Sequence, residues 1–205
     1  MSVIHIVDDE ESVRSSLAFL LEIAGFATRT YASADALLAR VDALEDGCIV
    51  TDLRMPEVNG VELLRRLRAA GTDIPAIVVT GHADVQMAVE AIRHGAFDFI
   101  EKPFSDATII GSLHRAMDGA TIVADQRLNA QARVLVDAMS VRERDVMRGV
   151  VNGLPNKLIA ENLGISPKAV EDHRSSLMER MQVRSLPELV RVTMDLEMLR
   201  ESDGA

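Results

Sequence analysis

The most constraining feature of this sequence is the alternation, over its first 120 residues, of short apolar runs with segments of helical periodicity. The candidate strands are Val3–Val7, Ala27–Tyr31, Cys48–Asp52, Ala76–Thr80 and Phe97–Ile100, and runs such as Ile77-Val78-Val79 are continuously apolar. The helical segments are Glu11–Ala24, Ala34–Val41, Val61–Ala69, Val85–His94 and Asp106–Met117. Continuously apolar runs are typical of parallel strands covered on both faces. We therefore predict a flavodoxin-like, doubly wound parallel sheet of five strands in the order 2-1-3-4-5.

The rest of the chain shows helical periodicity only. Capping-box patterns begin at Ser140 and Ser185, and Ser166-Pro167 is typical of a helix start. The expected helices are approximately 141–152, 156–163, 167–181 and 186–198. The short turn Gly164-Ile165-Ser166 gives the second pair helix-turn-helix spacing. We predict an α/β domain over residues 1–120, a helical linker over 121–139 and a small all-α domain over 140–205.

Charge is divided unevenly between these parts. Residues 1–129 hold 11 Lys and Arg against 20 Asp and Glu, whereas residues 130–205 hold 11 against 12. The whole-chain net charge of −10 therefore does not exclude nucleic-acid binding by the second part. No apolar run is long enough for a membrane span, and no secretory signal pattern is present. We expect a cytoplasmic protein without a membrane partner, in which the single cysteine, Cys48, is a buried hydrophobe.

Polar residues follow four of the predicted strands. They are Asp8 and Asp9, then Asp52, Thr80 and Lys102. Because the carboxyl ends of parallel strands share one edge, these side chains should meet there. Three carboxylates repel one another and need a hard cation, Mg²⁺ or Mn²⁺. With Lys102 and Thr80 beside it, the site suits phosphoryl transfer to Asp52, on the middle strand, as an acyl phosphate.

These residues carry a family resemblance. Residues 1–120 resemble the receiver domain of two-component response regulators, through Val7-Asp8-Asp9-Glu10, Thr51-Asp52-Leu53-Arg54-Met55-Pro56, Gly60, Thr80-Gly81 and Glu101-Lys102-Pro103-Phe104. The resemblance implies that Asp52 accepts a phosphoryl group from a partner histidine kinase. It implies Mg²⁺ bound by Asp9, Asp52 and the backbone carbonyl of Arg54, with Asp8 nearby through water. Lys102 would contact the phosphate and precede a cis proline, while Thr80 and Phe99 would form the switch pair.

Residues 135–198 resemble the LuxR-type DNA-binding domain, through segments 154–160, 163–166 and 170–174. The resemblance implies four helices, with 167–181 as the recognition helix in the major groove of double-stranded DNA. The expected core is Ile159, Leu163, Ile165, Val170, Leu177, Met181 and Leu189. Candidate DNA contacts are Asn156, Lys157, Lys168, Glu171, His173 and Arg174; His173 fits a structural role equally well. Because Asp172 adds a second negative charge beside Glu171, we expect a monomer to bind weakly and a dimer on a two-fold site to bind usefully.

Both parts together look closest to the FixJ-type members of the NarL/FixJ family of response regulators. The resemblance implies a phosphorylation-controlled transcriptional regulator, an activator working with RNA polymerase. In that group a haem-containing kinase responds to low oxygen, which here is analogy alone. Phosphorylation would shift the face over residues 85–118 so that two receivers pair. The candidate dimer contacts are Val85, Val89, Ile92, Arg93 and His94, although an apolar face on that helix also suits a core.

Other functions were weighed against this one. Phosphatases with an aspartyl nucleophile carry a second Asp two positions later, where this chain has Arg54. We therefore predict no enzyme activity beyond slow self-dephosphorylation. A receiver with a protein-binding or RNA-binding output remains open. A nucleotide-binding protein is disfavoured, because no GxGxxG or P-loop follows the first strand and acidic residues stand there instead.

Overall fold

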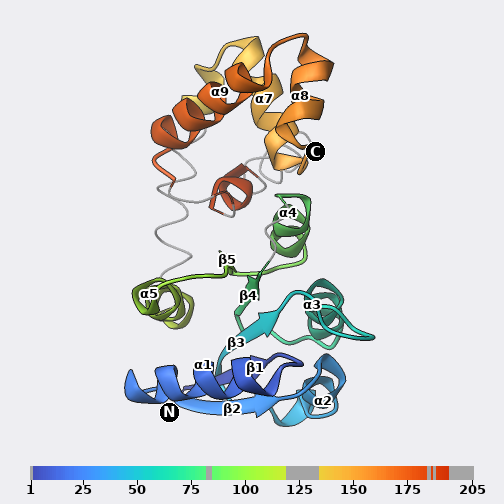
Figure 1. The fold of residues 1–205 in the computed structure, drawn as a ribbon, viewed down its shortest axis with the longest axis vertical. Helices are drawn as coiled ribbons and strands as arrows, with labels where there is room; N and C mark the ends of the chain where they lie inside the picture. Colours follow the sequence, from blue (N-terminus) through green and yellow to red (C-terminus); the bar gives the residue numbers. More distant parts are fainter. Residues whose placement is uncertain (1, 82–84, 119–133, 184–185, 187, 194–205) are drawn as a thin grey trace. The chain divides into compact units, whose positions relative to one another are not determined.

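A computed structural model of the chain forms an α/β unit and a helical unit, which are described separately (Figure 1). The structure describes residues 2–81, 85–118, 134–183, 186 and 188–193. Within these ranges no helix combines the length and apolar character needed to cross a membrane. Most of the predicted linker, the second half of the helix expected at 186–198, and Ser185 and Pro187 of its capping box lie outside the described residues.

The α/β unit is built on a five-stranded parallel sheet of order β2-β1-β3-β4-β5, as predicted. The strands are β1 (Val3–Val7), β2 (Ala27–Tyr31), β3 (Gly47–Asp52), β4 (Ala76–Thr80) and β5 (Asp98–Glu101). The fifth strand was predicted one residue too early. Its ladder begins where Asp98 pairs with Ile77 and ends where Glu101 pairs with Thr80, so pairing with β4 and not apolar character sets its limits.

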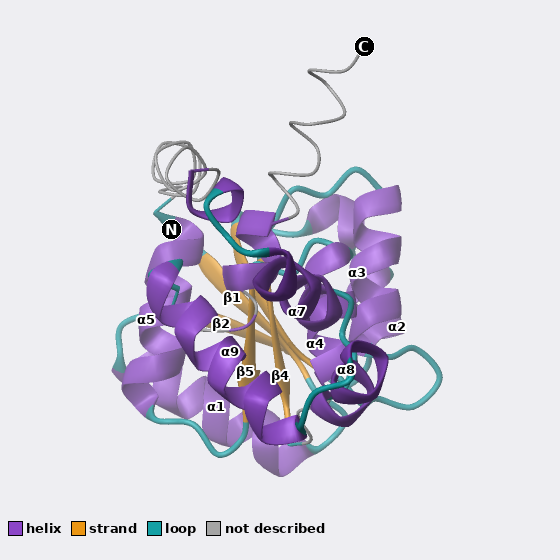
Figure 2. Cartoon of the chain, turned by 90° about the horizontal axis from the view of Figure 1, so that it is seen from above, coloured by secondary structure: helices purple, strands orange, loops and turns teal. Residues whose placement is uncertain are grey.

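Helices cover both faces of this sheet. They are α1 (Glu11–Ile23), α2 (Ala34–Leu38), α3 (Gly60–Ala69) and α5 (Asp106–Met117). Helix α4 (Val85–Arg93) follows β4 in the chain. Helices α1 and α5 lie on one face, and α2 and α3 lie on the other (Figures 1 and 2). Leu21 of α1 and Leu113 of α5 are fully buried in the cluster that includes Ile6 and Val50 of the central strands. This two-sided burial explains why the central strands are continuously apolar.

Helix α2 is shorter than its sequence pattern predicts. It ends at Leu38, and a 3₁₀ turn follows at Val41–Ala43. The amide of Arg40 bonds to the carbonyl of Leu37, three residues back, and Arg40 itself leaves helical geometry with φ −119° and ψ 14°. The apolar periodicity of the sequence therefore extends to Val41, beyond Leu38, where the α-helical backbone hydrogen bonds end.

The helical unit contains α7 (Val141–Val151), α8 (Asn156–Leu163) and α9 (Pro167–Arg180). Residue 186 and residues 188–193 are also helical. Ser140 forms the predicted capping box, Gly164 ends α8 in the left-handed region, and Ser166 caps α9. The ion pair between Arg180 and Glu143 joins α9 to α7. This arrangement confirms the helix-turn-helix.

All seven predicted core residues of the helical unit pack in one cluster. Ile159, Val170, Leu177, Met181 and Leu189 are buried, and Leu163 and Ile165 are partly buried against them. Val136 and Met139 belong to the same cluster. The core thus includes residues before position 140, where the helical domain was predicted to start; that boundary stays a prediction.

A matched pair of substitutions on α1 tests the core of the α/β unit. Leu21 is completely buried, whereas Phe19 is 66% exposed. We expect Leu21→Ala to lower the free energy of unfolding by about 2–5 kcal/mol, because it leaves a cavity. Phe19→Ala should change it by less than about 0.5 kcal/mol. Tyr31 is the only tyrosine and tryptophan is absent, so urea unfolding followed by tyrosine emission reports on this unit. Equal effects of the two substitutions would contradict the packing.

Candidate functional site

The amine of Lys102 joins two carboxylates at the carboxyl edge of the sheet. Its Nζ donates to Oδ1 of Asp52 at 2.9 Å and to Oδ2 of Asp8 at 3.3 Å. Asp8 follows β1, Asp52 ends β3 and Lys102 follows β5, so three strands contribute to the cluster. The side chains of Asp8 and Asp52 are only 8% and 11% exposed. The predicted convergence of these three residues is therefore observed.

Main-chain amides hold the other oxygen of each carboxylate. Oδ2 of Asp52 accepts from the amide of Arg54 at 2.6 Å, and Oδ1 of Asp8 accepts from the amide of Glu10 at 2.9 Å. In both cases the amide lies two positions after the aspartate, so the start of each loop folds back toward the side chain of that aspartate. Each carboxylate is thus oriented by its own loop on one side and by Lys102 on the other.

The charges at this edge are unequal. Burial lowers the pKa of Lys102, but hydrogen bonding to Asp52 and the charges of Asp52 and Asp8 outweigh burial and raise the pKa above its ordinary value. Lys102 therefore stays protonated at neutral pH. One ammonium faces two carboxylates, which leaves an excess negative charge in a partly buried site. Such a site suits a further cation.

Gly60 allows the loop after β3 to close against Asp52. The amide of Gly60 donates to the carbonyl of Leu53 at 2.9 Å. A Cβ on Gly60 would lie 2.6 Å from the backbone oxygen of Asp52, which is closer than two such atoms approach. The first residue of α3 must therefore be glycine if the backbone at Asp52 is to keep this position.

Thr80 and Phe99 lie on neighbouring strands. Thr80 ends β4 and is buried, and its carbonyl accepts the amide of Lys102 at 2.7 Å. Phe99 is half-buried on β5 and pairs with Val78, two residues before Thr80. Since alternate residues of a strand share a face, Thr80 and Phe99 lie on the same side of the sheet. This placement is compatible with the predicted switch pair.

The remaining predicted metal ligands stand at the same edge. Asp9 follows Asp8 with an exposed side chain, and Arg54 is held there by its amide bond to Asp52. The peptide bond between Lys102 and Pro103 is cis, as the resemblance implies. Among the described residues, no group of three or more His, Cys, Asp or Glu side chains is arranged to hold a metal ion. The carboxylates of Asp8 and Asp52, which outnumber the Lys102 ammonium, are oxygen donors that fit a hard, mostly hydrated ion.

In the helical unit, charges on the recognition helix are paired with one another. The Nζ of Lys168 lies 3.1 Å from Asp172 and 3.5 Å from Glu171, at i,i+4 and i,i+3 spacing. Hydrogen bonding to Asp172 is the main cause that raises the pKa of Lys168. The three side chains are at least 55% exposed. We predicted Lys168 and Glu171 as DNA contacts from the sequence and missed their pairing, although the i,i+3 and i,i+4 spacing is a sufficient signal for it.

The other candidate DNA contacts differ in how far their side chains are exposed to solvent. Nη1 of Arg174 donates to Oδ1 of Asn156 at 2.7 Å and so links α9 to the start of α8. Arg174, Asn156 and His173 are each partly buried, while Lys157 is exposed. Lys157 is therefore free to meet a ligand, and the Arg174–Asn156 pair holds the two helices together.

The candidate dimer contacts lie on and just after α4. Val89 and Ile92 are buried, Arg93 is exposed and His94 is partly exposed. The side chain of Val85 is outside what the structure describes. Cys48, on β3, is fully buried, and burial raises the pKa of its thiol to about 12, which confirms its role as a core residue.

Fold and site together define a two-domain protein, with a receiver-type α/β unit and a helix-turn-helix unit. Residues 4–114 match the response regulator receiver domain, and residues 137–193 match the bacterial regulatory proteins of the luxR family. The chain belongs to the response regulators of the NarL/FixJ type. Such a protein is a phosphorylation-dependent transcriptional regulator of a two-component system.

Similar proteins support this assignment over the whole chain. The transcriptional regulatory protein FixJ of Rhizobium meliloti is 51% identical over 93% of this chain and 94% of its own length. The C4-dicarboxylate transport transcriptional regulatory protein DctR of Rhodobacter capsulatus is 44% identical over 93% of this chain and 98% of its own length. The crystal structure of full-length FixJ from B. japonicum is 41% identical over 96% of this chain and 98% of its own, with a TM-score of 0.57.

Removing Lys102 should expose the charge imbalance of the site. We expect Lys102→Met to lower the free energy of unfolding at pH 7 by roughly 2 kcal/mol or more, because two carboxylates lose their shared cation. The deficit should shrink on addition of Mg²⁺, which supplies the missing positive charge. Urea unfolding followed by tyrosine emission measures both effects. Arg65→Met, which removes an exposed cation of the same unit, is the control, and a deficit that Mg²⁺ leaves unchanged would contradict the electrostatic explanation.

Proposed function

We propose that Asp52 is the phosphoacceptor of this regulator and that a cognate histidine kinase is the donor. The observation that carries the proposal is the Lys102 amine, which bonds to Asp52 while also contacting Asp8. An ammonium in this position faces whatever group becomes attached to Asp52. Phosphoryl transfer depends mainly on such positioning and charge stabilisation.

In the proposed reaction, a carboxylate oxygen of Asp52 attacks phosphorus, and the bond from phosphorus to the kinase histidine nitrogen breaks. Lys102 then pairs with the phosphoryl oxygens in place of the Asp52 carboxylate. Asp9, Asp52 and the carbonyl of Arg54 would hold Mg²⁺ or Mn²⁺, with Asp8 acting through water. The ion supplies the positive charge that neutralises the acidic edge and the incoming group. The protein would act as a phosphoacceptor with at most slow self-dephosphorylation.

The proposed output begins at Thr80, whose hydroxyl would turn toward the phosphoryl group while the ring of Phe99 moves inward. A population shift of this kind would favour pairing of two receivers through the candidate contacts on α4. Arg93 is exposed, whereas Val89 and Ile92 are buried.

Recognition of DNA would rest on α9 in the major groove. Lys157 and Lys168 would contact phosphates, and Glu171 could accept from a cytosine amine. Asn156, His173 and Arg174 would support that surface or join it. Two such domains on a two-fold site would offset the acidic residues of each. We expect the protein to act in the cytoplasm as an activator that works with RNA polymerase; its low-oxygen stimulus stays an analogy.

Replacement of Asp52 by Asn tests the acceptor directly. Asp52→Asn should abolish incorporation of phosphate from acetyl phosphate, because the amide cannot form the acyl phosphate. The stoichiometry is measured by intact-protein mass spectrometry with Mg²⁺ present. Asp73→Asn, at a fully exposed aspartate, is the matched control and should label like the wild type. Full phosphorylation of the Asp52→Asn variant would mean that another residue is the phosphoacceptor.

Replacement of Asp172 by Asn tests the charge pattern of α9. Asp172→Asn should raise affinity for any duplex, roughly threefold, because it removes a negative charge near phosphates and releases Lys168. Lys168→Ala should weaken binding to all duplexes and reduce the salt slope by about 1. Fluorescence anisotropy at several salt concentrations provides both numbers. Asp145→Asn, at a partly exposed acid paired with Arg148 on α7, is the control. Unchanged affinity for both α9 variants would place the DNA on another surface.

A further inference from the structure

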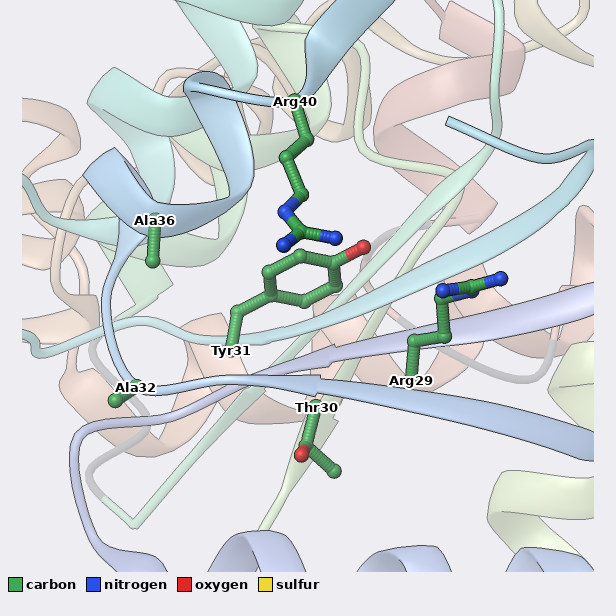
Figure 3. A pocket seen from close by; sticks show the side chains of 6 residues that line it. All are labelled: Arg29, Thr30, Tyr31, Ala32, Ala36 and Arg40. Carbon is green, nitrogen blue, oxygen red and sulfur yellow. The ribbon is translucent and has the colours of Figure 1, made fainter. Parts of the chain in front are cut away.

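A pocket of about 380 Å³ opens beside the edge strand of the α/β unit, between β2 and α2 (Figure 3). It is lined by Arg29, Thr30, Tyr31, Ala32, Ala36 and Arg40. None of these residues takes part in the acidic site or in the helix-turn-helix. The volume lies at the lower end of roughly 300–1,000 Å³, the range of small-molecule sites.

A hydrogen bond to the buried His5 fixes the tyrosine of this pocket. Oη of Tyr31 lies 3.2 Å from Nδ1 of His5, and Nε2 of His5 lies 2.9 Å from the carbonyl oxygen of Glu45. His5 is completely buried. Because a carbonyl only accepts, Nε2 carries the hydrogen in the neutral ring, and Nδ1 accepts from the Tyr31 hydroxyl. The phenol is therefore held in one orientation, with its oxygen still able to accept a hydrogen bond.

The charge of the lining is positive. It includes two arginines and no acidic residue, although residues 1–129 carry 20 Asp and Glu. Arg29 is paired with Glu45, a neighbour outside the lining. The side chain of Arg40 forms no ion pair within the described part of the chain, and it reaches over Tyr31 with its guanidinium beside the phenol (Figure 3). Burial raises the pKa of Tyr31, and the charges of Arg29 and Arg40 oppose that rise.

We propose that this pocket binds the carboxylate or phosphate group of a small organic anion, with the Arg40 guanidinium as its main contact. A guanidinium presents parallel N–H donors that match the paired oxygens of either group. The charge of Arg29 is largely balanced by Glu45, so Arg40 supplies the net positive charge of the lining. Ala32, Ala36 and the ring of Tyr31 provide apolar surface for the body of the ligand. An anion would avoid the acidic edge, where carboxylates outnumber the ammonium, and would be attracted to this pocket.

The pocket contains its own reporter. Tyr31 is the only tyrosine and the chain has no tryptophan, so emission excited near the tyrosine band comes from the pocket. The full-length protein is titrated with acetate, with glycerol 1-phosphate and with neutral glycerol, in the absence of divalent ions and at constant ionic strength set with chloride. We expect a saturable change in emission for at least one anion, with a dissociation constant of about 1 mM, and none for glycerol. The tighter of the two anions identifies the group that the pocket prefers.

Variants separate binding at this pocket from a general effect of salt. Arg40→Ala should weaken the anion at least tenfold, and Arg40→Lys, which keeps the charge but loses the paired donors, should weaken it less. Arg65→Ala is the control, because Arg65 is an exposed arginine paired with Glu62, as Arg29 is with Glu45. Thermal unfolding confirms that the variants fold. The proposal is overturned if no anion saturates the signal by about 50 mM, if glycerol gives the same change, or if Arg40→Ala binds like Arg65→Ala.

Discussion

The arrangement of the acidic edge depends on one ammonium group shared by two carboxylates. Without Lys102, Asp8 and Asp52 would repel each other in a place where solvent screens them poorly, since their side chains are about one-tenth exposed. With Lys102 in place, the residual charge is still negative. In the function that we propose, the same imbalance that costs stability in the resting protein would favour binding of a divalent cation, so the same three residues would affect both stability and function.

The sheet explains why such distant residues meet. Asp8, Asp52 and Lys102 are separated by up to 94 positions, yet all three stand at the carboxyl ends of parallel strands. Parallel order β2-β1-β3-β4-β5 places β1 beside β3 and brings β5 close through β4. Gly60 completes the arrangement, because any side chain at this position would press on the backbone of Asp52. The order of the strands, rather than the conformation of the loops, therefore brings the three residues together.

Sequence reasoning succeeded where one physical signal dominates. Apolar runs located β1, β3 and β4, and polar strand ends located Asp8, Asp52 and Lys102. It failed where hydrogen bonds decide the outcome, as at the end of α2 near Arg40 and at the start of β5, because periodicity does not record them. The pocket beside Tyr31 was also missed. It depends on His5 and Glu45, which approach Tyr31 only in the folded sheet, and no spacing in the sequence indicates that contact.

The paired charges on α9 have a consequence for the search along a chromosome. Lys168 already has Asp172 and Glu171 as internal counter-ions, so a DNA phosphate must compete with them before it gains the ammonium. DNA of unrelated sequence offers only phosphates. Replacing the carboxylate partners of Lys168 by a phosphate would therefore gain little binding free energy there. A site that also engaged the released carboxylates through base amines would recover more. If Lys168 and Glu171 contact DNA as we propose, the recognition helix would therefore leave unrelated DNA sooner, because of the same ion pairs that it would exchange at its operator.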